Sequence, residues 1–148
     1  MLLDKLTQLA DGWAPTTNTT TYTSYSYDCG DVTPKREIGT GEPLALVFTV
    51  GAAATGATDT TVLGACSATS GTDLSADVLI LASRLIPNAS LTTGSVHVVP
   101  IPPGSVTQRY IGGYVTLGTG DAITLDVNIV PMSLIGITKA YADAVTWT

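Results

Sequence analysis

The feature that most constrains the fold is a strict alternation of apolar and polar residues over 122–130. Apolar residues stand at every second position with polar residues between them: Ile123, Leu125, Val127 and Ile129 against Thr124, Asp126 and Asn128. Successive side chains of a β-strand point to opposite faces, so this period places all the apolar side chains on one face. The pattern predicts a half-buried antiparallel strand.

Other segments also have strand composition. They are rich in β-branched, aromatic or aliphatic residues and lie between turn-forming residues: 21–27, 44–50, 60–66, 77–85, 95–101 and 109–117. The segment 44–50 is nearly all apolar, which is typical of a strand covered on both faces. Gly112 and Gly113 indicate a bulge or a close backbone approach. Roughly seven or eight short strands predict an all-β fold, either a jelly roll or another two-sheet antiparallel β-sandwich.

The two ends of the chain differ from this strand-rich centre. Apolar residues over 2–10 have a spacing that fits one face of a short helix, which Pro15 would end. A segment this short does not hold a helix alone, so a docked helix and an extended arm both remain open. We therefore expect one domain, with an N-terminal arm or short helix over 1–15, a sandwich over 16–135 and a C-terminal tail over 136–148.

Charge is scarce in this sequence, and its balance is acidic. Charged residues make up 12% of the 148 residues and apolar ones 45%, and the net charge is −6. A surface so poorly charged is typical of a subunit that packs against neighbours. The six basic residues are scattered and form no stripe that could neutralise phosphates, so we expect no nucleic-acid partner. No apolar run reaches the roughly 18 residues that span a bilayer, so we expect no membrane partner.

The start of the sequence lacks the cationic region, apolar stretch and cleavage site of a secretory signal. We therefore expect Cys29 and Cys66 to be reduced, buried thiols.

No constellation for catalysis or metal binding is evident. His97 is the only histidine and no Gly-x-Ser-x-Gly motif is present, so we expect no catalytic residue. One histidine and two distant cysteines do not make a zinc site. Asp126 and Asn128 share a strand face, which we interpret as a solvated face and not as a calcium site. The Gly-Thr-Gly-Glu segment at 39–42 lacks the Lys-Ser/Thr of a phosphate-binding loop. We expect no enzymatic activity, cofactor, metal or small-molecule substrate.

Several short motifs resemble those of one protein family. Asp28-x-Gly30 is followed by Arg-Glu-Ile-Gly-Thr-Gly-Glu-Pro-Leu over 36–44. Together they resemble a stretch of the capsid cement (decoration) proteins of tailed bacteriophages, of the Bordetella-phage type. The start of the chain over 3–11 and the proline-rich turn at 100–104 are similar to the same family. The chain departs from the family pattern at Cys29, in its long Thr- and Tyr-rich strand over 16–27, and after Pro131.

The resemblance implies a jelly-roll domain on the outside of the capsid that bridges and stabilises major capsid protein subunits. The implied partners are the major capsid protein and further copies of the chain, in a dimer or another small homo-oligomer. The implied location is the outer surface of the virion, after synthesis in the host bacterial cytoplasm. The resemblance implies neither enzymatic activity nor a cofactor. The residues expected at protein interfaces are leucines of the arm, charged residues near the motif, and two tyrosines: Leu3, Leu6, Leu9, Arg36, Glu37, Glu42, Tyr22 and Tyr25.

Two other classes of function stay open. A carbohydrate-binding jelly-roll module of a phage or bacterial surface structure needs exposed aromatic side chains on one face. The aromatic residues available for that role are Tyr22, Tyr25, Tyr27, Trp13 and Trp147. The other class is a hydrolase or other enzyme built on a β-sandwich; a Ser-His-Asp triad in it would have to use His97.

Overall fold

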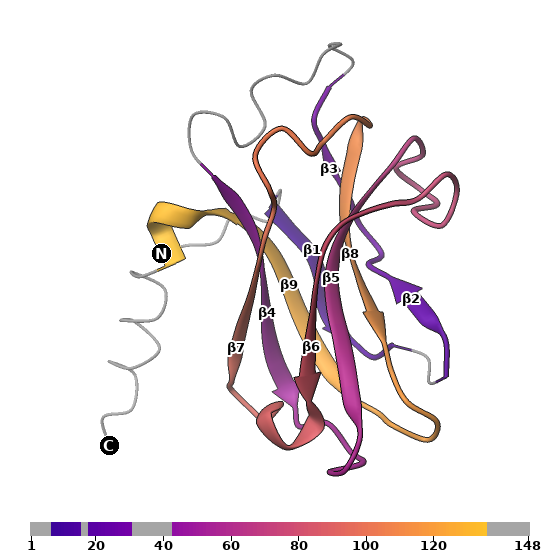
Figure 1. The fold of residues 1–148 in the computed structure, drawn as a ribbon, viewed down its shortest axis with the longest axis vertical. Helices are drawn as coiled ribbons and strands as arrows, with labels where there is room; N and C mark the ends of the chain where they lie inside the picture. The colour runs from indigo at the N-terminus through magenta and orange to yellow at the C-terminus, as the bar shows by residue number, and fades with distance from the viewer. Residues whose placement is uncertain (1–6, 16–17, 31–42, 136–148) are drawn as a thin grey trace.

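The computed structural model describes residues 7–15, 18–30 and 43–135. These residues form two antiparallel sheets that face each other (Figure 1). The strands in the described part are β1 (Gln8–Trp13), β2 (Thr20–Tyr22), β3 (Tyr27–Asp28), β4 (Leu44–Ala52), β5 (Thr60–Ala68), β6 (Leu79–Pro87), β7 (Val96–Pro100), β8 (Tyr110–Thr116) and β9 (Thr124–Pro131). A short 3-10 helix, η2 (Asn88–Ser90), joins β6 to β7, and residues 132–135 are helical.

The strand order is that of a jelly roll. The first sheet has the order β1-β9-β4-β7, and the second has β2-β8-β5-β6 with β3 also paired to β8. Each early strand pairs with a late one in nested order: β1 with β9, β2 and β3 with β8, β4 with β7, and β5 with β6. A long hairpin rolled up in this way gives two facing four-stranded sheets when β2 and β3 count as one interrupted strand. The structure confirms the predicted all-β sandwich and shows that it is a jelly roll.

The core lies between the sheets and follows the predicted alternation. Leu125 and Val127 of β9 are fully buried and lie opposite Val50 and Phe48 of β4. Burial of each such side chain contributes about 1.5–3 kcal/mol to the free energy of folding. On the opposite face of β4, Val47 is also buried, which explains why 44–50 is nearly all apolar.

The glycines of β5 and β8 allow close packing on the outer face of the second sheet. Gly64 lies opposite Tyr114, whose ring is so close that a Cβ on Gly64 would come within 2.1 Å of it. A Cβ on Gly112 would come within 2.2 Å of Leu74. The register of β5 with β8 is continuous through Gly113. Of the two predicted alternatives for the glycine pair, the close approach is therefore confirmed. No bulge interrupts β8 against β5, but on the other side of β8 four residues, 23–26, lie opposite the two glycines.

The structure corrects the expected arm or helix at the N-terminus. Gln8–Trp13 is strand β1, paired with β9, so the sandwich includes this segment and does not begin at residue 16. Two register shifts interrupt that pairing, and Leu9 and Ala10 are both buried although they are neighbours. These irregularities remove the period of two that would have marked a strand. Residues 1–6 of the arm and the tail over 136–148 lie outside the described residues.

The Thr- and Tyr-rich segment is not one long strand. Thr23 separates β2 from β3, and its side-chain oxygen accepts a hydrogen bond from the backbone N–H of Gly113 at 3.1 Å. The same hydroxyl donates to the carbonyl of Tyr25 at 2.9 Å. This side chain takes over bonding that the backbone of a regular strand would make, and the chain turns aside before β3. Tyr25 then donates its backbone N–H to the carbonyl of Leu9 at 3.1 Å, which ties the turn to β1.

A buried polar cluster joins three connections at one end of the sandwich. Asn88 accepts a hydrogen bond from the Thr61 hydroxyl at 2.7 Å. Its amide donates to Asp121 at 2.9 Å and to the carbonyl of Thr55 at 2.8 Å. Asn88 is 2% exposed, so each of these bonds compensates for lost hydration.

Within the described ranges, no helix is long and apolar enough to cross a membrane.

Replacing Gly64 with alanine should destabilise the protein, because the new Cβ displaces the Tyr114 ring. We expect a decrease of about 1–3 kcal/mol in the free energy of unfolding, measured by urea denaturation. Gly51→Ala is the matched control, since its Cβ would lie 3.5 Å from the Thr124 side chain, an ordinary contact. The control should be neutral or slightly stabilising. Equal losses in both variants would contradict the close packing at Gly64.

Candidate interaction surfaces

Three of the eight residues predicted at a protein interface lie in the described part of the chain, namely Leu9, Tyr22 and Tyr25. Leu9 is 1% exposed and packs in the core. Its prediction as an interface residue is therefore corrected, because its apolar contacts are made within the sandwich. The other five lie outside the described residues: Leu3, Leu6, Arg36, Glu37 and Glu42.

The two tyrosines differ in their surroundings. Tyr22 of β2 is half-buried, and its ring centre lies 6.4 Å from that of Tyr114. Tyr25 is 66% exposed, in the turn between β2 and β3. Tyr25 is thus free to contact a partner with most of its ring, and a role for both residues at an interface stays a prediction.

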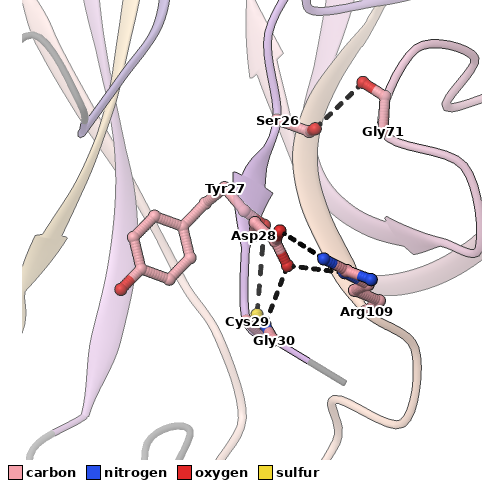
Figure 2. Close-up of polar contacts among 7 residues, drawn as sticks. All are labelled: Ser26, Tyr27, Asp28, Cys29, Gly30, Gly71 and Arg109. Atoms are coloured by element: carbon pink, nitrogen blue, oxygen red, sulfur yellow. Dashed lines mark hydrogen bonds and ion pairs between the residues drawn. The ribbon is translucent and has the colours of Figure 1, made fainter.

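An ion pair fixes β3 at one rim of the sandwich (Figure 2). Asp28 accepts two hydrogen bonds from the Arg109 guanidinium, one from Nε and one from Nη2, each at 2.9 Å. Asp28 Oδ1 also accepts the backbone N–H of Gly30 at 2.8 Å. The guanidinium lies 5.2 Å from the ring centre of Tyr110. All of these contacts hold the end of β3 against the start of β8.

The strength of this ion pair is limited by solvent. The side chains of Arg109 and Asp28 are 38% and 46% exposed. An exposed pair contributes about 0–1 kcal/mol, although the paired geometry favours the upper part of that range. The Asp28-x-Gly30 motif therefore has a structural role that the sequence did not reveal: it sets the direction in which the chain leaves β3.

A groove, which we call the Trp13–Tyr25 groove, lies between β1 and the turn before β3. It has a volume of about 790 Å³ and is lined by residues of β1 and of the turn before β3: Gln8, Ala10, Asp11, Gly12, Trp13, Ala14, Ser24, Tyr25 and Ser26. Trp13 and Tyr25 provide aromatic surface, and Asp11 and Gln8 provide polar groups. The combination of an aromatic wall with a few hydrogen-bonding groups is typical of a site that binds a peptide or a sugar.

The opposite lateral edge of the sandwich is apolar. Strand β6 ends the second sheet and β7 ends the first, and the two lie side by side (Figure 1). Arg84 bridges the two strands by donating to the carbonyl of Val98 at 3.5 Å. The large apolar side chains exposed along this edge are Leu79, Ile80, Leu85 and Val96. We refer to these four residues as the β6 edge.

The backbone of the β6 edge is irregular. Ala65 pairs with Ala82, but its neighbour Cys66 pairs with Ile80, so Leu81 is an extra residue on β6. A bulge of this kind interrupts the regular row of backbone groups that an added strand would need. Contacts at this edge are therefore expected mainly from its side chains.

His97 lies beside a serine hydroxyl, and its polar contacts in the described part of the chain include no carboxylate. His97 Nε2 lies 3.1 Å from the Ser95 hydroxyl. Burial, followed by the nearby Arg84 cation, lowers the pKa of His97, while a hydrogen bond to the Ser90 backbone opposes this shift. A nucleophile and a base are thus adjacent, but the charged group that affects the histidine is a cation and not the carboxylate of a triad. Within 7–15, 18–30 and 43–135, no group of three or more His, Cys, Asp or Glu side chains could hold a metal ion.

The two cysteines differ in accessibility. Cys66 is buried in β5, and burial raises the pKa of its thiol to about 12, against a smaller lowering by a hydrogen bond to Gly112. Cys29 is half-buried beside β3, so only Cys66 matches the predicted buried thiol.

Sequence reasoning missed two parts of these surfaces. The segment 77–85 was recognised as apolar, but nothing in its composition shows that β6 ends a sheet and faces solvent. The pairing of Asp28 with Arg109 joins residues far apart in the chain. The only sequence signal was that Asp28 belongs to the Asp28-x-Gly30 motif.

Comparison with known proteins identifies one family. The Bbp16 family model matches residues 14–129, which span the fold from β2 to most of β9. No curated protein matches the sequence.

His97 should make the protein less stable in acid. Its folded-state pKa is lowered, so its contribution to stability is present above the unfolded pKa of about 6.5 and is lost as the pH falls through the folded value. We expect the melting temperature of the wild type to fall more between pH 7.5 and pH 5.5 than that of His97→Gln. Identical pH dependence in the two proteins would show that the histidine is not perturbed.

The thiols should differ in reactivity under native conditions. Only thiolates react with maleimides, and the raised pKa and burial of Cys66 suppress its thiolate. Mass spectrometry of the folded protein should therefore show labelling at Cys29 before Cys66, and both should react in urea. Faster labelling of Cys66 would contradict its burial.

Proposed function

Because this chain belongs to the Bbp16 family of Bordetella phage proteins, we propose that it is a capsid cement (decoration) protein. In this role it binds the outer surface of the phage head and bridges subunits of the major capsid protein. The family match over residues 14–129 is the observation that carries the proposal. The resemblance of the Asp28-x-Gly30 and 36–44 motifs to capsid cement proteins supports the same function.

The distribution of surfaces supports a bridging role. A protein that links two capsid subunits needs two separate contact regions. The Trp13–Tyr25 groove lies at the β1 end of the first sheet, and the β6 edge lies beside β7, at the other end of that sheet. Two contacts of moderate affinity give a high combined affinity, because the second contact forms within an already assembled lattice.

The exposed apolar side chains of the β6 edge support the proposal that the partner is a protein. Leu85 and Ile80 are 65% and 53% exposed, and burying each of them at an interface would contribute on the order of 1 kcal/mol. Exposed apolar side chains gathered on one edge mark a contact region. We propose the major capsid protein as the partner of both regions and a second copy of this chain as a further partner, without any enzymatic role, cofactor or nucleic acid.

Purified protein should bind phage heads that lack it. We expect co-sedimentation in a fixed molar ratio and a higher temperature of head disruption, because each bound copy links neighbouring subunits. Leu85→Ser should lower both effects relative to Ala57→Ser, a control at an exposed position in the β4–β5 connection. Wild-type protein that remains in the supernatant, with no gain in the heat resistance of the heads, would overturn the proposal.

A carbohydrate-binding module is the second candidate, and the Trp13–Tyr25 groove favours it. Aromatic rings beside the carboxylate of Asp11 and the amide of Gln8 suit the apolar faces and hydroxyls of a sugar. Binding on a glycan array that is lost in Trp13→Ala, together with no binding to heads, would favour this function. Binding to heads without any glycan signal would exclude it.

A further inference from the structure

The outer face of the first sheet carries a second, polar groove. It is lined by Gln8, Thr49, Asp126 and Asn128 and has a volume of about 310 Å³. The strand register explains why these side chains meet. Asn128 lies directly opposite Gln8 on β1, and Asp126 lies directly opposite Thr49 on β4. Opposite residues of paired strands share a face, and β9 uses its other face for the core.

Asn128 has an unusual position for a polar residue on this face. It is 5% exposed, and its side-chain carbonyl oxygen is the single buried side-chain nitrogen or oxygen atom without a hydrogen-bond partner among the described residues. Nearly all buried polar atoms in proteins are paired, because an unpaired acceptor has lost its water without compensation. The Asn128 carbonyl is therefore an acceptor for which residues 7–15, 18–30 and 43–135 supply no donor.

The charge of the groove defines that donor. Asp126 gives the groove a carboxylate, and Asp126 Oδ1 accepts the backbone N–H of Gly12 at 2.6 Å. No lysine, arginine or histidine is among the described residues that line it. A carboxylate beside an unpaired carbonyl favours a ligand that is both cationic and rich in donors. Lysine, with three N–H donors, and arginine, with five, have this chemistry.

We propose that the groove between β1, β4 and β9 binds a lysine or arginine side chain of the major capsid protein. The inference rests on the proposed function, which supplies the identity of the partner. The cationic group donates hydrogen bonds to the Asn128 carbonyl and pairs with the Asp126 carboxylate. Thr49 and Gln8 complete the polar walls. Charged pairs across an interface set specificity and register, so this pair would fix how the protein sits on the head.

The first test compares two variants that remove one negative charge each. Affinity for phage heads that lack the protein is measured by sedimentation for Asp126→Asn and for the control Asp73→Asn, an exposed aspartate between β5 and β6. We expect about a tenfold loss of affinity for Asp126→Asn and less than a twofold change for Asp73→Asn. The affinity of Asp126→Asn should also depend less on salt. Equal affinities for the two variants would overturn the inference.

The second test separates binding from folding. Asn128→Leu replaces the unpaired acceptor with an apolar group of similar size, so the free protein should melt at the same temperature or higher. Its affinity for heads should nevertheless fall about tenfold, by loss of the donor contact. A lower melting temperature with unchanged affinity would show that Asn128 serves the fold, for example through a bound water molecule, and would overturn the inference.

The outcomes also separate the two proposals. Wild-type protein that does not bind heads overturns both, because the head protein is the named source of the cation. If the wild type binds heads and both Asp126→Asn and Asn128→Leu bind them with the same affinity, only the proposed role of the groove is overturned.

Discussion

The structure depends on β9 and on the alternation of its side chains. This strand lies between β1 and β4 in the first sheet. It therefore pairs the first described strand with the last one and joins both to β4. Its apolar face, with Leu125, Val127 and Ile129, fills the space between the sheets. Its polar face, with Asp126 and Asn128, looks away from that core. Stability and recognition therefore use the same backbone, and a shift of one residue in its pairing would exchange the two faces.

Much of the fold could be predicted wherever the period of two is regular. The strand over 122–130, which is β9, was predicted from this period, and the strand over 44–50, which is β4, from its nearly continuous apolar run. The segment 95–101 was predicted from its valines and corresponds to β7. Strand β1 was not predicted, because its two register shifts place Leu9 and Ala10 both in the interior. The break between β2 and β3 was not predicted either. It depends on a hydrogen bond between Thr23 and Gly113, which composition does not reveal.

The contact surfaces were less predictable than the fold, for a physical reason. Whether an apolar strand is interior or at an edge depends on which strands pair with it, so the exposure of Leu85 on β6 follows from the topology alone. Asn128 shows the same limit. The alternation correctly placed it beside Asp126 on a polar face, and we interpreted that face as solvated. Its burial arises in the three-dimensional setting of β9 between β1 and β4, which a single segment of sequence does not contain.

The bulge at Leu81 has a consequence for solution behaviour. A sandwich with an apolar edge on one side and a groove on the other has the two surfaces needed for head-to-tail association. A heterologous contact of this kind that does not close into a ring gives an open-ended fibre. Interrupting the backbone of β6 removes the continuous ladder on which such growth would depend. The apolar side chains of the β6 edge remain available to a surface that presents matching pockets, while strand-to-strand growth at β6 itself is disfavoured. At this strand, a subunit made in many copies can thus reserve its apolar side chains for a template.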